Sequence, residues 1–148
     1  MTNDVIVKLS GLQYNDDNPN PEPIEIISPG SYYAKNDSHY IIYDEFSEDS
    51  SGVTNNKIKL KNNCVEITKK GTTNVKMVFE KDKKMHTYYQ TPYGSLLVAI
   101  LANNINVSET EKELAIKIDY ELEIDSQPLA DCKIQITVCP KEETSLLS

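Results

Sequence analysis

The 148-residue sequence contains no arginine, and all fifteen of its basic residues are lysine. The planar guanidinium group of arginine suits bidentate phosphate recognition, whereas lysine offers only a point charge. The 23 acidic residues give a formal net charge of −8. Because nucleic-acid backbones bind basic surfaces, we expect no nucleic-acid partner. Lysines do gather between residues 57 and 84, but such a stripe is more typical of a solvated strand face.

Signatures of metal, disulfide and catalytic chemistry are also absent. The three cysteines, Cys64, Cys132 and Cys139, have no CxxC spacing, so neither a disulfide framework nor a zinc site is expected. His39 and His86 lie far apart and form no HxH or HExxH motif. The sequence has no GKS/T phosphate loop and no GxSxG elbow. We therefore expect neither a cofactor nor an enzymatic activity.

No apolar run approaches the roughly 20 residues that a membrane-spanning helix needs. The first residues, MTNDVIVKL, lack the basic start and apolar stretch of a secretion signal. We therefore expect a cytoplasmic protein without membrane contact. The length suits one domain with its own core. We assign a barrel to residues 1–140 and a short tail to residues 141–148.

Period-two alternation is the dominant pattern in the sequence. Residues 114–124 alternate apolar and mostly charged side chains, as expected of a strand with one wet face. Shorter segments of the same kind recur along the chain, separated by turn signals such as NDDNPNPEP, SEDSSG and DSQP. Short strands at this spacing predict an all-β fold. We expect a single antiparallel barrel, or a sandwich, of about eight to ten strands.

One segment, residues 96–102, is apolar at every position. Periodicity alone allows a helix, but the neighbouring strands and the β-branched Ile105 and Val107 favour a strand. A strand that is apolar on both faces needs cover on its outer side. The N-terminal segment, the C-terminal Ser-Leu-Leu or a second subunit would supply it. We predict a homodimer or partner contact centred on Leu97, Ala99 and Leu101.

Two charged residues share the phase of apolar neighbours that we take as inward-facing. Glu45 follows Ile41 and Tyr43, and Lys69 follows Val65 and Ile67. Burying either charge alone is costly. One interpretation is a partly solvated ion pair at the barrel mouth. The other is that the Lys69 ammonium, with tyrosine hydroxyls nearby, binds the anionic head of an apolar ligand.

The stretch HTYYQTPYG, residues 86–94, continues this inward phase through alternate side chains. Pro92 marks a strand end, because proline cannot donate to a β-ladder. One interpretation is a barrel corner in which Tyr93 packs locally. The other adds these side chains to the pocket. The predicted ligand-binding residues are then Tyr43, Glu45, Lys69, Tyr89, Thr91 and Tyr93.

Several segments together resemble the uncharacterised YwiB-like family of small bacterial proteins. They are SPGSYYAKNDSHYIIYDE, SGVTNNKIKL, ITKKG, VKMVFE, YYQTPYG and IDYELEI, and the resemblance extends from Val5 to Val138. It implies a calycin-like, lipocalin-related antiparallel β-barrel and no established activity. The family usually carries arginine where this chain has Lys69, so a bidentate contact there is reduced to a single ammonium.

Two functional hypotheses follow. The first is a barrel that holds a small apolar or amphipathic ligand in its interior, with the polar end near Lys69, Tyr43 and Tyr89. The second is a protein-interaction module that uses the apolar strand at residues 97–101 or the acidic outer face and holds no ligand.

Overall fold

The computed structural model describes residues 3–14, 22–46, 52–71, 74–91 and 94–141. Ten β-strands make up this part of the chain. They are β1 (Asp4–Tyr14), β2 (Ile24–Lys35), β3 (Ser38–Phe46), β4 (Val53–Lys61), β5 (Cys64–Gly71), β6 (Val75–Phe79), β7 (Lys84–Thr91), β8 (Gly94–Glu109), β9 (Leu114–Ile124) and β10 (Gln127–Pro140).

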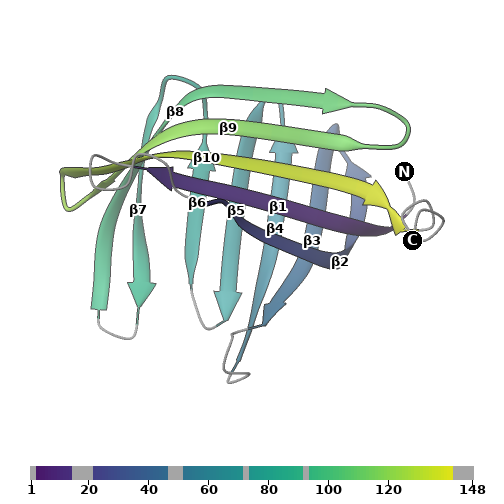
Figure 1. The fold of residues 1–148 in the computed structure, drawn as a ribbon, viewed down its shortest axis with the longest axis horizontal. Helices are drawn as coiled ribbons and strands as arrows, with labels where there is room; N and C mark the ends of the chain where they lie inside the picture. Colours follow the sequence, from purple (N-terminus) through teal and green to yellow (C-terminus); the bar gives the residue numbers. More distant parts are fainter. Residues whose placement is uncertain (1–2, 15–21, 47–51, 72–73, 92–93, 142–148) are drawn as a thin grey trace.

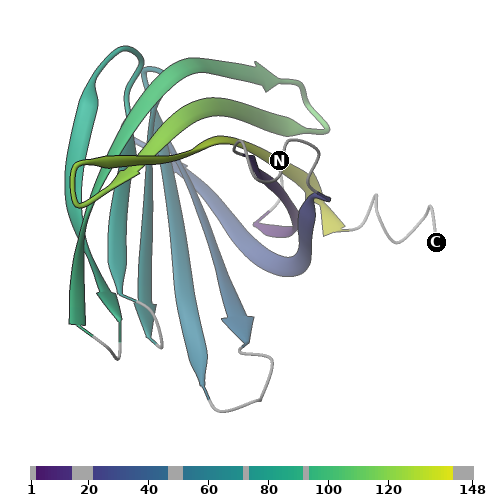
Figure 2. The same cartoon turned by 60° about the vertical axis from the view of Figure 1, so that its left-hand side comes forward.

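The strands form one antiparallel sheet in the order β6-β5-β4-β3-β2-β1-β10-β9-β8-β7. The sheet curls on itself, so that β1 and β8 to β10 cross in front of the steeper β3 to β6 (Figures 1 and 2). β6 and β7 are its two ends. They meet near a bridge between Lys81 and Ala102, where the Asp82 amide donates to the Ala102 carbonyl at 2.8 Å. The predicted all-β antiparallel barrel of eight to ten strands is confirmed.

Three tight hairpins connect neighbouring strands, each through two residues with positive φ. These pairs are Asn36-Asp37, Asn62-Asn63 and Asp125-Ser126. Asn and Asp tolerate the left-handed conformation, and two successive left-handed residues match the twist of a hairpin. The predicted turns at residues 62–63 and in DSQP are therefore confirmed.

Alternate side chains of the strands fill the interior. In β9, Leu114, Ile116 and Ile118 are at most 1% exposed, as the alternation predicts. The largest fully buried side chains come from both walls of the barrel: Phe79, Ile41, Ile58, Ile100, Leu114, Ile116, Ile118 and Ile136. This part of the interior is occupied by the protein's own side chains.

The apolar segment 96–102 lies in β8, so the strand interpretation is confirmed and the helix is not formed. β8 rises beside β7 and then turns over the top of the barrel (Figure 2). A register shift against β9 falls between Ala102 and Asn104, and such a bulge increases local bending. Among the described residues, no helix is long and apolar enough to cross a membrane. Most of the predicted tail, residues 142–148, lies outside the described residues.

Candidate functional site

Polar side chains meet at the end of the barrel where β3, β5 and β7 finish, the lower end in Figure 1. Tyr43 on β3 stands opposite Asn56 on β4, and Asn56 stands opposite Lys69 on β5. Side chains at paired positions share one face of a sheet. The three side chains therefore form a row that faces the interior, and Glu45 lies on the same face one pair further toward the opening. We call Tyr43, Glu45, Asn56 and Lys69 the mouth cluster.

Glu45 and Lys69 form an ion pair, with Nζ and Oε1 separated by 3.1 Å. Their side chains are 36% and 24% exposed, so solvent screens the pair. Pairs of this kind contribute about 1 kcal/mol or less. The two charges that the alternation placed on the inward face therefore form a partly solvated ion pair, as in the first of the two interpretations of the sequence.

Asn56 is the buried member of the cluster, with 0% exposure. Its Nδ2 donates to the Thr54 carbonyl at 3.3 Å and to Glu45 Oε1 at 3.4 Å. Two acceptors on one side fix the orientation of the amide. Its Oδ1 is buried and has no hydrogen-bond partner among the described residues. An unsatisfied buried acceptor costs about 1–3 kcal/mol, so the site favours an incoming donor.

Tyr43 keeps its hydroxyl protonated at neutral pH. Burial raises the pKa of Tyr43 from 10.0 to about 12, and the negative charge of Glu45 adds to the shift. The residue is only 3% exposed. Tyr43 therefore offers a neutral hydroxyl beside a carboxylate and an ammonium.

This shift predicts alkaline destabilisation. Because the folded pKa is raised, the contribution of Tyr43 is fully present below pH 10 and is lost as the pH rises through about 12. A two-unit shift corresponds to about 2–3 kcal/mol. Urea unfolding at pH 9 and pH 11.5 should show a smaller loss of stability for Tyr43→Phe than for the wild type. Equal losses would show that Tyr43 titrates normally.

A groove of about 700 Å³ opens beside the mouth cluster, between β4 to β6 on one side and β7 on the other. Lys69 connects the two features, since it belongs to the cluster and also lines the groove. Of the described residues, four lysines and no carboxylate line the groove, in a chain of net charge −8. The described residues that line it are Asn55, Lys57, Thr68, Lys69, Lys70, Asn74, Val75, Lys76, Thr87 and Tyr88.

The remaining predicted ligand residues lie on or after β7. Tyr89 is partly buried and packs against the core, in the predicted inward phase. Thr91 ends β7, but its side chain and the whole of Tyr93 lie outside the described part of the structure. Because core side chains fill the interior further in, the groove at the mouth is the better candidate for a ligand site.

Leu97, Ala99 and Leu101, the predicted contact residues, lie on the outer side of β8. Ala99 is 5% exposed, whereas Leu97 and Leu101 are half-buried. An ion pair of 2.6 Å between Lys84 Nζ and Glu123 Oε2 joins β7 to β9 and so crosses β8. The side chains of Lys84 and Glu123 therefore cover part of the outer face of β8, for which the sequence analysis expected a cover.

One polar network was not predicted from the sequence. At the other end of β3, the Tyr32 hydroxyl lies 2.6 Å from His39 Nδ1, and His39 Nε2 lies 3.2 Å from Glu109 Oε2. Glu109 ends β8, so no short spacing links it to the other two in the sequence. These three residues do not line the groove beside the mouth cluster. Their network joins β2, β3 and β8.

The sequence analysis also did not single out Asn56, although Asn56 shares the inward phase of Ile58 and Leu60 on β4.

The fold is a nearly closed, ten-stranded antiparallel barrel, and the mouth cluster lies at one end of it. Residues 7–136 match the family described as a domain of unknown function, DUF1934, and the chain belongs to that family. The crystal structure of the ywiB protein from Bacillus subtilis is similar in fold, with a TM-score of 0.81 and 20% identity. The similarity covers 93% of this chain and 92% of that one. No curated protein matches the sequence.

Proposed function

We propose that this barrel is a non-enzymatic binding protein that takes an amphipathic anion into the groove at its mouth. The observation that carries the proposal is the composition of the groove, in which four lysines and, among the described residues, no carboxylate line a space of about 700 Å³. That volume falls within the range of roughly 300–1,000 Å³ typical of small-molecule sites.

The groove also defines the chemistry of the ligand. Lys69 offers a positive charge at the point where the groove meets the mouth cluster, and the ligand's anion would compete with Glu45 for it. Val75 and the ring of Tyr88 supply apolar surface. We assign this role to the cytoplasm, because the sequence shows no cysteine pattern of a disulfide framework, as expected in a reducing compartment.

The test uses laurate as the probe in isothermal titration calorimetry. Lys69→Met keeps the length of the side chain and removes its charge, so we expect affinity to fall about tenfold, as for one lost charged contact. Glu45→Gln frees Lys69 from its competitor, so affinity should be equal or higher. Native mass spectrometry of the protein purified from its source should also show a bound anion.

The two substitutions separate a binding site from a structural ion pair. If the pair only stabilises the fold, both variants lose the same small amount of stability and leave laurate binding unchanged. Lys61→Met, an exposed lysine at the far end of β4, serves as the charge-matched control and should bind like the wild type. Equal affinity for laurate in Lys69→Met and Lys61→Met would refute the proposal.

A further inference from the structure

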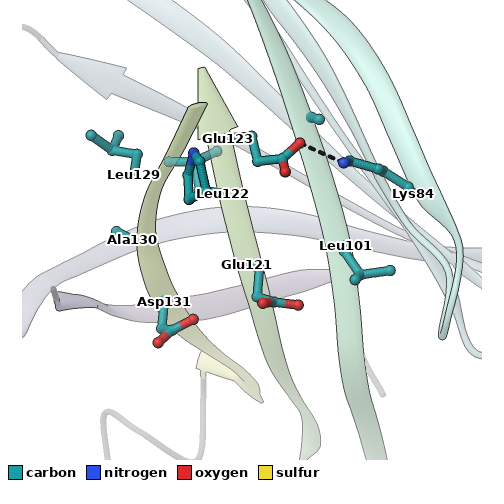
Figure 3. Close-up of a pocket in the computed structure, with 10 residues that line it drawn as sticks. Lys84, Leu101, Glu121, Leu122, Glu123, Leu129, Ala130 and Asp131 are labelled. Atoms are coloured by element: carbon teal, nitrogen blue, oxygen red, sulfur yellow. Dashed lines mark ion pairs between the residues drawn. The ribbon is translucent and has the colours of Figure 1, made fainter. Parts of the chain in front are cut away.

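A second hollow, of about 340 Å³, lies on the outer surface of β8 to β10, away from the mouth groove of β4 to β7 (Figure 3). Four of its residues form one row across neighbouring strands, in the order Lys84, Leu101, Glu121 and Asp131. Because paired residues share a face, this row runs straight across the outer wall. Apolar Ala99, Pro128 and Leu129 line the same hollow.

A β-bulge presents Leu129 to solvent. The register of β10 against β9 shifts between Pro128 and Ala130, so Leu129 has no partner in the ladder. Leu129 is 40% exposed and lines the hollow. Bulges redirect side chains and are common near functional surfaces.

The surface around this hollow carries more negative than positive charge. Glu121 and Asp131 stand directly opposite each other on β9 and β10, an arrangement that destabilises a sheet. Lys84, the cation of the hollow, pairs with Glu123. Within the described part of the chain, neither Glu121 nor Asp131 has an ion-pair partner. An exposed leucine and two unpaired carboxylates therefore lie together on one wall.

We infer that this surface docks a cationic segment of another protein, with an apolar side chain that packs on Leu129 and Leu101 and with lysine or arginine residues that face Glu121 and Asp131. Charge complementarity selects this occupant. A two-fold contact with a second copy of the chain would bring the same carboxylates toward each other, and that repulsion opposes the contact. The inference is independent of the ligand proposed at the mouth.

The probe is a fluorescent hexapeptide of alternating lysine and leucine, measured by fluorescence anisotropy against the full chain. Removing both carboxylate charges with Glu121→Gln/Asp131→Asn should weaken binding about tenfold, and most of this difference should vanish at high salt. Leu129→Ser should also weaken binding about tenfold, because it removes the apolar anchor. Peptides that alternate lysine with serine, or glutamate with leucine, should bind at least tenfold more weakly.

The control for net charge is Glu25→Gln/Glu66→Gln, which removes two carboxylates from other strands, β2 and β5. It should bind the hexapeptide within twofold of the wild type. If it weakens binding as much as Glu121→Gln/Asp131→Asn, the attraction belongs to the whole acidic molecule, and the site is refuted. Self-association that Leu129→Ser abolishes would identify a second copy as the occupant and would also overturn the inference.

Discussion

Replacing Phe79 with alanine is expected to lower the free energy of unfolding by about 3–5 kcal/mol, the usual cost of truncating a buried phenylalanine. Phe79 is 0% exposed, and its ring meets that of Tyr120 edge to face, with 5.0 Å between centroids. It ends β6, a five-residue strand at one end of the sheet. The contact therefore ties β6 to β9, on the other side of the barrel. Urea denaturation at pH 7 measures the loss.

Val78→Ala is the matched control, because Val78 precedes Phe79 on the same strand and is only half-buried. We expect it to cost about 1 kcal/mol, in line with one partly exposed side chain. A loss of less than 1 kcal/mol for Phe79→Ala would mean that the barrel does not close through β6. Because burial raises the pKa of Tyr120, the cavity left by Phe79→Ala should also bring that pKa closer to its ordinary value.

The sequence predicted the strands, because their cause is local. Alternation tells which side chains of a strand share a face, and Asn-Asn or Asp-Ser pairs are turn residues whatever the fold. The same local reasoning placed Glu45 and Lys69 inside with their apolar neighbours. Their ion pair of 3.1 Å then follows from the pairing of β3 with β4 and of β4 with β5.

Features that depend on distant strands were not predictable. Alternation does not say that β1 pairs with β10 or that β6 and β7 form the ends of the sheet, so the groove between them left no signal. The bulge at Leu129 depends on register against β9, which the alternation of β10 alone does not fix. The alternation of a strand also does not show how much of the barrel interior its inward side chains fill. The expected interior pocket is, in its described core, occupied by isoleucine and phenylalanine side chains.

Asn56 tests how the mouth cluster balances stability against binding. Asn56→Asp replaces the Nδ2 donor with an oxygen that faces the Thr54 carbonyl and the Glu45 carboxylate. A second carboxylate in this fully buried position would share the Lys69 ammonium with Glu45 and should cost about 3–5 kcal/mol at pH 7. Burial and Glu45 raise the pKa of the new carboxyl above its unfolded value of about 3.9. The penalty therefore shrinks as the pH falls through that folded pKa, and urea unfolding at pH 7 and pH 4.5 should show it.

Asn56→Leu is the counterpart that separates fold from function. It removes the unsatisfied Oδ1, and that gain offsets the loss of two long hydrogen bonds to the Thr54 carbonyl and Glu45 Oε1. We expect stability within about 1 kcal/mol of the wild type, and laurate affinity unchanged, since laurate offers Oδ1 no donor. A hydroxylated probe such as 12-hydroxylaurate should lose affinity in Asn56→Leu if its hydroxyl reaches Oδ1. Equal losses of stability in Asn56→Asp and Asn56→Leu would mean that hydrogen bonds to the amide, and not exclusion of charge, make asparagine necessary at this position.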